Sequence, residues 1–240
     1  MLTVPGGWRG VPRRLPCGGT AYLLPRCRHI DWSRAEYRLF LEALRPGGVV
    51  LDIGANVGFH ALFFGKQVAP GGKVYAFEPA LQSFEALRQH VAMNGQTALV
   101  HPVHAAVGDR PGTLSFVADG VQGSNHVAPA GASPAATVTV PCVTVDGFCE
   151  EHGIHPTVMK IDTEGFELQV LRGARRTIRS AGAGLVLFIE LHPTFWRRAG
   201  YGRAELQAEL DSLGLAPHAV PPGVDIWSED SGVAVEFRPR

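Results

Sequence analysis

The sequence has few cysteines, no excess of charge and no long apolar run. Its four cysteines form no C-x-x-C pair, which argues against a zinc site and against a disulfide-rich secreted domain. Basic and acidic residues number 22 each, so the chain lacks the overall positive charge typical of nucleic-acid-binding proteins. No window approaches the ~20 apolar residues of a membrane span, and the first residues lack the apolar core of a signal peptide. We therefore expect a cytoplasmic protein that binds neither nucleic acid nor membranes.

What the sequence does contain is an alternation of strand-like and helix-like segments. Helices are predicted over 59–69, 81–95, 166–182 and 203–214, and within 31–48, where Ser33 and Glu36 form a capping box and Pro46-Gly47-Gly48 ends the helix. Strands are predicted over 49–55, 73–79, 98–108, 157–162, 184–192 and 232–239. This alternation indicates an α/β fold with a mostly parallel sheet and helices on both faces.

One segment, 118–140, interrupts this alternation. It is rich in Gly, Ala, Ser and Pro, and then alternates Thr with Val. We interpret it as an insertion loop over about 118–136 that leads into an extra strand, either a lid or a loop without function. Ser124, Asn125 and His126 are polar enough to touch a substrate, and Asn125 is our candidate contact.

The chain divides into an N-terminal extension with a lead-in helix, 1–47, and one main domain, 48–240. Whether the extension shapes the substrate site or forms the contact of a homodimer stays open at this point.

The stretch LDIGANVGFH follows the first strand of the main domain. In open parallel sheets, ligands bind at the carboxyl ends of the strands, and glycines such as Gly54 and Gly58 let the backbone turn tightly near a ligand. The stretch lacks the G-x-G-x-x-G fingerprint of pyrophosphate binding, and carries Asp52 and Asn56 instead. A carboxylate repels a pyrophosphate but suits S-adenosylmethionine, which carries a sulfonium and an ammonium group. Glu78, at the end of the next strand, is placed to accept hydrogen bonds from ribose hydroxyls.

Five segments together resemble the FkbM-like family of S-adenosylmethionine-dependent methyltransferases: LDIGANVGFH, VYAFEP, HAAVGD, MKIDTEGFELQVLRGA and FIELHP. The resemblance covers about residues 48–193 and implies a Rossmann-like class I methyltransferase fold with an antiparallel last strand. It also implies methylation of a hydroxyl on a small molecule, natural product or sugar. The cofactor contacts that it implies are Asp52, Gly54, Ala55, Asn56, Gly58, Glu78, Ala105 and Ala106.

Charged residues gather at two further strand ends, in KIDTEG and FIELHP. Because parallel strands end at one edge of the sheet, Asp162, Glu190 and His192 are expected to converge on one pocket. Glu164 is expected to open the following helix, and Lys160 lies on the same face of its strand as Asp162. Taken singly, these residues suit structural roles, with Lys160 pairing to an acid; taken together, they favour a functional pocket.

Methylation of an alcohol requires removal of its proton. Either Asp162 or His192 acts as the general base, or Asp162 and Glu190 hold a divalent cation such as Mg²⁺ that lowers the pKa of the hydroxyl. Lys160 and Glu190 complete the catalytic candidates. Glu164 and Trp196 are candidate substrate contacts, with Phe195, Trp196 and Tyr201 forming either an aromatic wall or a cover over the core.

Two other functions compete with methyl transfer. A nicotinamide-dependent oxidoreductase is disfavoured by Asp52 and Asn56, because they replace the loop geometry that a pyrophosphate prefers. A cofactor-binding scaffold without catalysis requires the acids of the pocket to be idle. The strand end Ile-Asp-Thr-Glu-Gly also differs from the Asn-Pro-Pro-Tyr type of amino-group methyltransferases, which disfavours nitrogen acceptors in DNA, RNA or protein.

Overall fold

The structure is a computed structural model that describes residues 10–27, 36–117, 126–127, 137–197, 199–220, 225–228 and 234–240. Its centre is a seven-stranded sheet with the order β12-β13-β11-β10-β3-β4-β5. The strands are β3 (Val49–Ile53), β4 (Lys73–Phe77), β5 (Val100–Val103), β10 (Val158–Ile161), β11 (Val186–Glu190), β12 (Leu215–Ala219) and β13 (Ala234–Pro239). Strands β5, β4, β3, β10 and β11 run parallel, and β13 is antiparallel to both of its neighbours. The predicted parallel sheet with an antiparallel last strand is confirmed.

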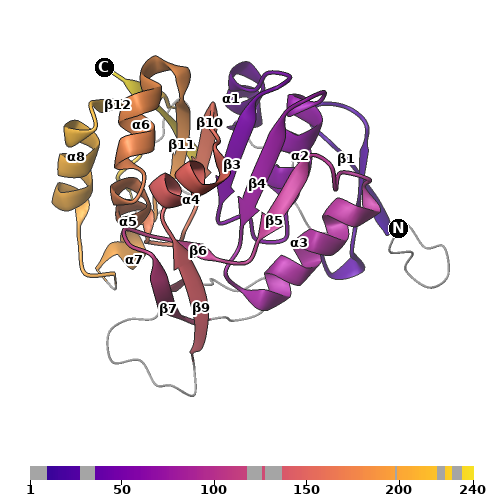
Figure 1. Ribbon diagram of the computed structural model, residues 1–240, viewed down its shortest axis with the longest axis horizontal. Helices are drawn as coiled ribbons and strands as arrows, with labels where there is room; N and C mark the ends of the chain where they lie inside the picture. Colours follow the sequence, from indigo (N-terminus) through magenta and orange to yellow (C-terminus); the bar gives the residue numbers. More distant parts are fainter. Residues whose placement is uncertain are drawn as a thin grey trace.

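Helices cover both faces of this sheet (Figure 1). One face packs on α1 (Glu36–Ala43), α2 (Phe59–Val68) and α3 (Leu81–Met93), through a cluster that joins strand residues such as Val50 and Phe188 to helix residues such as Phe40. The other face packs on α4 (Val145–His152), α5 (Glu167–Arg172), α6 (Arg175–Ala181) and α8 (Arg203–Ser212). The inner strands β3, β4, β10 and β11 are buried on both sides, which explains the continuous apolar runs in the sequence.

Two predicted elements are split in the structure. The expected strand over 98–108 forms β5 and a separate β6 (Ala106–Val107), which joins β7 (Gly112–Val117), β8 (His126–Val127) and β9 (Val138–Val143) in a second sheet. The extra strand expected after the insertion loop is β9. The expected helix over 166–182 forms α5 and α6. The break lies at Gly173, where an added Cβ would come within 2.0 Å of the carbonyl oxygen of Gly108. Strand β12 and helix α4 were not predicted.

The N-terminal residues pack onto the main domain. The hairpin of β1 (Val11–Arg14) and β2 (Thr20–Leu23) lies against α3, where the Tyr22 N–H donates to Asn94 Oδ1 over 2.7 Å. The N–H of Leu24 donates to Nε2 of His90 over 2.9 Å, and Nδ1 of His90 donates to the carbonyl of Val57 over 2.7 Å. The hairpin is thus tied through His90 to the glycine-rich turn. The predicted cap Ser33 lies outside the described residues.

None of the helices in the described ranges is long and apolar enough to span a bilayer.

Candidate functional site

A cavity opens at the carboxyl ends of β3, β4 and β10. Five of the predicted cofactor contacts line it: Gly54, Asn56, Glu78, Ala105 and Ala106. Apolar side chains that the sequence patterns did not single out, including Phe116 of β7 and Phe166, complete its wall. The cavity therefore combines polar groups with a broad apolar surface, which is typical of sites for small molecules and cofactors.

The turn after β3 is shaped by a close approach of two backbones. Gly54 has a φ of 82°, and a Cβ added there would lie 1.7 Å from the carbonyl oxygen of Asp162, so only glycine fits. Gly58, at the start of α2, has a φ of 89° and lies against Leu87 of α3. Ala55 is buried in the core. Gly58 and Ala55 thus shape the turn from behind, rather than lining the cavity as the resemblance implied.

Glu78 lies in the cavity wall and is held by backbone groups. Its Oε2 accepts from the N–H of Asn56 and its Oε1 from the N–H of Ala80, both over 2.8 Å. Burial of the carboxyl group raises the pKa of Glu78 to about 7, although both N–H groups act in the opposite direction. A carboxylate held in this way can accept further hydrogen bonds from a diol in the cavity.

Asp52 lies behind the cavity instead of facing it. Its side chain is 0% exposed, and neither carboxylate oxygen has a hydrogen-bond partner in the part of the chain that the structure describes. Asp52 is the register partner of Lys160 on β10, so both side chains are on the same face of the sheet. Burial raises the pKa of Asp52, whereas the charge of Lys160 lowers it. The structure therefore corrects the expected direct contact between Asp52 and the cofactor.

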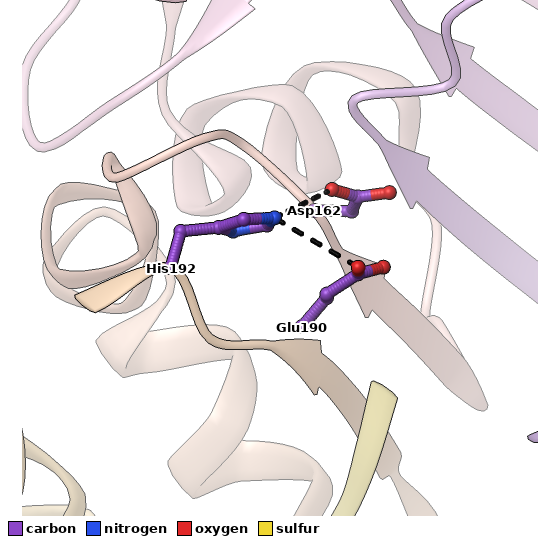
Figure 2. A group of neighbouring side chains, drawn as sticks. All are labelled: Asp162, Glu190 and His192. Carbon is purple, nitrogen blue, oxygen red and sulfur yellow. Dashed lines mark ion pairs between the residues drawn. The ribbon is translucent and has the colours of Figure 1, made fainter. Parts of the chain in front are cut away.

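On the other side of the cavity, Asp162, Glu190 and His192 point toward one another (Figure 2). Asp162 and Glu190 come from the ends of the neighbouring strands β10 and β11, and His192 precedes α7 (Pro193–Trp196). His192 Nε2 lies 3.6 Å from Asp162 Oδ1 and 3.9 Å from Glu190 Oε1. Glu164 Oε2 is also 3.9 Å from this nitrogen. The four side chains therefore meet around His192 Nε2, although only Asp162 and Glu164 of the four line the cavity.

Lys160 lies beneath this cluster and is 1% exposed. Its Nζ donates to Asp162 Oδ2 over 2.9 Å. Burial disfavours the ammonium ion, but Asp162, Asp52 and Glu190 outweigh this effect and raise the pKa of Lys160. Burial also opposes the charge of Asp162, yet Lys160 and His192 lower the pKa of Asp162 to about 2. Lys160, predicted among the catalytic residues, therefore orients and neutralises Asp162 from below rather than facing the cavity.

Glu167, which the sequence reasoning missed, holds His192 in place. Its side chain is 0% exposed, and its Oε1 accepts from His192 Nδ1 over 2.8 Å. Burial lowers the pKa of His192, but the hydrogen bond and charge of Glu167, with Asp162 and Glu164, raise it to about 9. A signal was present in the sequence: Glu167 shares the helical spacing of the buried Val170, Leu171 and Ala174, so it is an acid at an inward-facing position.

The structure places the predicted substrate contacts in different surroundings. Trp196 is 3% exposed and its Nε1 donates to Glu167 Oε2 over 3.0 Å, so it forms core and not an aromatic wall. The hydroxyl of Tyr201 donates to the same oxygen over 3.0 Å. Glu164 was expected to open the helix, but α5 begins at Glu167. Glu164 lies in the turn before it, with a φ of 50°. Asn125 lies outside the described residues.

Comparison with known proteins gives a family match. The family model "Methyltransferase FkbM domain" matches residues 52–214. The hexuronic acid methyltransferase AglP of Haloferax volcanii is 26% identical over 170 residues, which cover 70% of this chain and 65% of that protein. The 31-O-demethyl-FK506 methyltransferase FkbM of Streptomyces tacrolimicus is 34% identical over 119 residues, covering 44% of this chain and 42% of that one. The chain thus spans less than two thirds of the length of these curated relatives.

Two solved structures share the fold. A methyltransferase FkbM from Methylobacillus flagellatus has a TM-score of 0.52 at 18% identity, covering 83% of this chain and 50% of that one. A putative rRNA methylase from Clostridium thermocellum has a TM-score of 0.50 at 9% identity, covering 85% of this chain and 92% of that one. At such low identity these likenesses speak for the fold alone, and they agree with the Rossmann-like arrangement of the sheet.

Proposed function

This chain belongs to the FkbM methyltransferase family, and from that premise we propose that it transfers a methyl group from S-adenosylmethionine to a hydroxyl group of a small molecule, natural product or sugar. The observation that carries the proposal is the cavity between Glu78 and Asp162. It joins a carboxylate suited to a ribose diol with an apolar wall suited to adenine, at the strand ends where α/β sheets bind cofactors. The four cysteines are all free, which supports the expected cytoplasmic location.

The cofactor is proposed to lie along the cavity with its ribose at Glu78 and its adenine near Ala105 and Ala106. The methionine part then reaches the turn at Gly54, beside Asp162. In this pose the sulfonium methyl group faces the cluster of Asp162, Glu190 and His192, because Asp162 lies beside the turn at Gly54. This order places the reacting carbon where polar side chains gather.

In the reaction, the acceptor oxygen forms a bond to the methyl carbon while the bond from carbon to sulfur breaks, and S-adenosylhomocysteine leaves. The protein mainly aligns the two groups, and such alignment is worth on the order of 7–11 kcal/mol. The proton of the hydroxyl goes to a group at the rim. Asp162, which is ionised, and His192, in the fraction of molecules in which its ring is neutral, are our candidates for this general base, because both belong to the cluster beside the cavity.

The acceptor class is supported by the relatives and by a second hollow. One relative is named for a hexuronic acid and the other for the natural product FK506. A second hollow shares Phe166 with the cofactor cavity. Charged and polar side chains such as Asp109, Arg110 and Gln169 line it, which suits a hydroxyl-rich acceptor.

Cofactor binding tests the first part of the proposal. Calorimetric titration with S-adenosylhomocysteine is expected to show binding to the wild type and weakened binding to Glu78→Gln. Glu85→Gln, at an exposed acid of α3, is the matched control and is expected to bind as the wild type does. Binding of NAD without binding of S-adenosylhomocysteine would support the oxidoreductase instead and overturn the proposal.

Methyl transfer tests the second part. With labelled S-adenosylmethionine and a panel of sugars and natural products bearing hydroxyls, we expect label in an ether product. Asp162→Asn and His192→Ala are each expected to lower turnover by roughly 10²–10⁴-fold while the cofactor still binds. Full turnover in both variants would exclude them as the base. Cofactor binding without transfer to any acceptor, together with retained biological function, would favour the scaffold.

A further inference from the structure

We propose that Asp162, Glu190 and His192 form a binding site for one divalent metal ion at the edge of the cofactor cavity. Each residue offers one ligand atom, and these atoms all lie within 4.8 Å of one another (Figure 2). Ion binding itself is independent of the methyltransferase proposal, whereas the catalytic use of the ion rests on it.

The distances within the cluster suit a shared ion better than direct hydrogen bonds. His192 Nε2 lies 3.6 Å from Asp162 Oδ1 and 3.9 Å from Glu190 Oε1, beyond the usual N–H···O range of ~2.7–3.2 Å. Two ligands that each lie about 2.1 Å from one ion are roughly 3–4.2 Å apart, depending on the angle between them. The two measured separations fall inside that range.

Two of the three ligands are held from behind by buried charged residues. Asp162 binds Lys160 through Oδ2, which leaves Oδ1 facing His192. His192 contacts Glu167 through Nδ1, which leaves Nε2 facing the two acids. A metal ion on Nε2 would displace the proton of the imidazolium ion from that nitrogen, while Nδ1–H would keep donating to Glu167. A carboxylate behind a histidine is the usual arrangement at metal sites, because it fixes the tautomer and the ring orientation.

The charge around the cluster is unbalanced. Asp162 and Glu190 end neighbouring parallel strands on the same face, and Glu164 adds a third carboxylate next to them. Beneath them Asp52 is 0% exposed and both of its oxygens lack a hydrogen-bond partner in the described ranges, an independent sign that a positive charge belongs nearby. Lys160 is the buried ammonium group that the structure places among these acids. A divalent ion between Asp162 and Glu190 would offset the excess.

The ligand set predicts which ions bind. Two carboxylates suit Mg²⁺ and Mn²⁺, and the imidazole nitrogen favours Mn²⁺ over Mg²⁺. Asp162 also lines the cofactor cavity, so an ion on it would lie where the acceptor hydroxyl meets the methyl group. There it would lower the pKa of the hydroxyl, whose proton would pass to a nearby carboxylate such as Glu164 before the oxygen attacks. With the ion bound, Asp162 and His192 would act as its ligands in place of the general-base role.

Binding of Mn²⁺ to the full chain, without cofactor, is the direct test. Loss of the electron paramagnetic resonance signal of free Mn²⁺ should report one bound ion per chain. Glu190→Gln and His192→Ala are each expected to weaken binding at least tenfold, and Glu167→Gln by roughly 10–100-fold through the loss of histidine positioning. Glu150→Gln is the control, since it removes the same charge from an exposed acid of α4 that lies outside the cluster and both hollows.

The outcomes separate the two proposals. Circular dichroism confirms that each variant is folded, and His192→Gln serves if His192→Ala is not. The metal site is overturned if the wild type does not deplete free Mn²⁺ at millimolar concentration, or if Glu190→Gln and His192 variants bind as the wild type does. In that outcome, the positive charge of protonated His192 offsets the neighbouring carboxylates. Mn²⁺ binding in a chain that does not bind S-adenosylhomocysteine would keep the metal site and overturn the proposed function.

Discussion

At the ends of β3 and β4 the site is shaped mainly by backbone, whereas at the ends of β10 and β11 it is shaped by charged side chains. In the first region, Gly54 accepts the close approach of another strand end, and Glu78 is held by two backbone N–H groups. In the second region, Lys160 and Glu167 hold Asp162 and His192 through side-chain contacts. Changes in the first region therefore act through shape, and changes in the second act through the balance of charge.

Lys160→Met should have the largest effect, because it removes the buried cation of the charged region. Without Lys160, no ammonium group would offset the negative charges of Asp162, Asp52 and Glu190. Removal of one partner from a buried ion pair costs about 3–5 kcal/mol, and we expect a loss of that size in the free energy of unfolding, measured in urea. Arg88→Met, which breaks an exposed pair with Glu85, should cost below about 1 kcal/mol. Equal losses in the two variants would contradict the buried charge balance.

Gly54→Ala should have the next largest effect and tests the backbone region. The new Cβ would meet the carbonyl of Asp162 at 1.7 Å, with the residue held at a φ of 82°. We expect a loss of about 2–4 kcal/mol in the free energy of unfolding, with loss of affinity for S-adenosylhomocysteine. Gly95→Ala is the control, because Gly95 has a φ of 66° but open space around it. This substitution should cost about 1 kcal/mol and leave cofactor affinity unchanged. Should Gly54→Ala behave like this control, the close approach would be refuted.

Glu167→Gln sharpens the comparison by weakening the hold on His192 while keeping the shape of the side chain. Oε1 of Glu167 accepts from both His192 and Gly165, so an amide nitrogen in its place removes both hydrogen bonds, and we expect a cost of about 1–3 kcal/mol in stability. Turnover should fall while the affinity for S-adenosylhomocysteine stays the same, because Glu167 does not line the cofactor cavity. Glu150→Gln, at an exposed pair with Arg176, is the control for both measurements. A parallel fall in affinity and turnover would mean that the two regions do not act separately.

The pH dependence of cofactor affinity should show the smallest effect. Burial holds the pKa of Glu78 at about 7, so below that pH the protonated carboxyl group accepts poorly from both ribose hydroxyls. The dissociation constant for S-adenosylhomocysteine should be on the order of tenfold higher at pH 6 than at pH 8, about 1.4 kcal/mol, by calorimetry. Glu78→Gln should bind weakly with no such pH dependence, and a wild-type constant that is flat with pH would rule out this role.

The same shift predicts how stability changes with pH in the absence of cofactor. Between the ordinary value of 4.5 and about 7, the unfolded chain has lost the proton of Glu78 and the folded chain keeps it. The folded state binds more protons, so this group makes the free energy of unfolding fall as pH rises through that window. The fall in the free energy of unfolding between pH 5 and pH 7, measured in urea, should be smaller in Glu78→Gln than in the wild type by the contribution of this one group.

By itself the sequence determined the α/β alternation, the glycine-rich turn and the meeting of Asp162, Glu190 and His192 at one edge. These follow from local rules, since periodicity predicts each element and parallel strands end on the same side. Only the tertiary structure decided which of these residues face the cavity. Asp52 and Trp196 are buried because helices cover them, and Lys160 lies beneath the acids because of its register with β3. Helix packing and strand register depend on contacts between residues far apart in the chain, so the pattern within one segment cannot predict them.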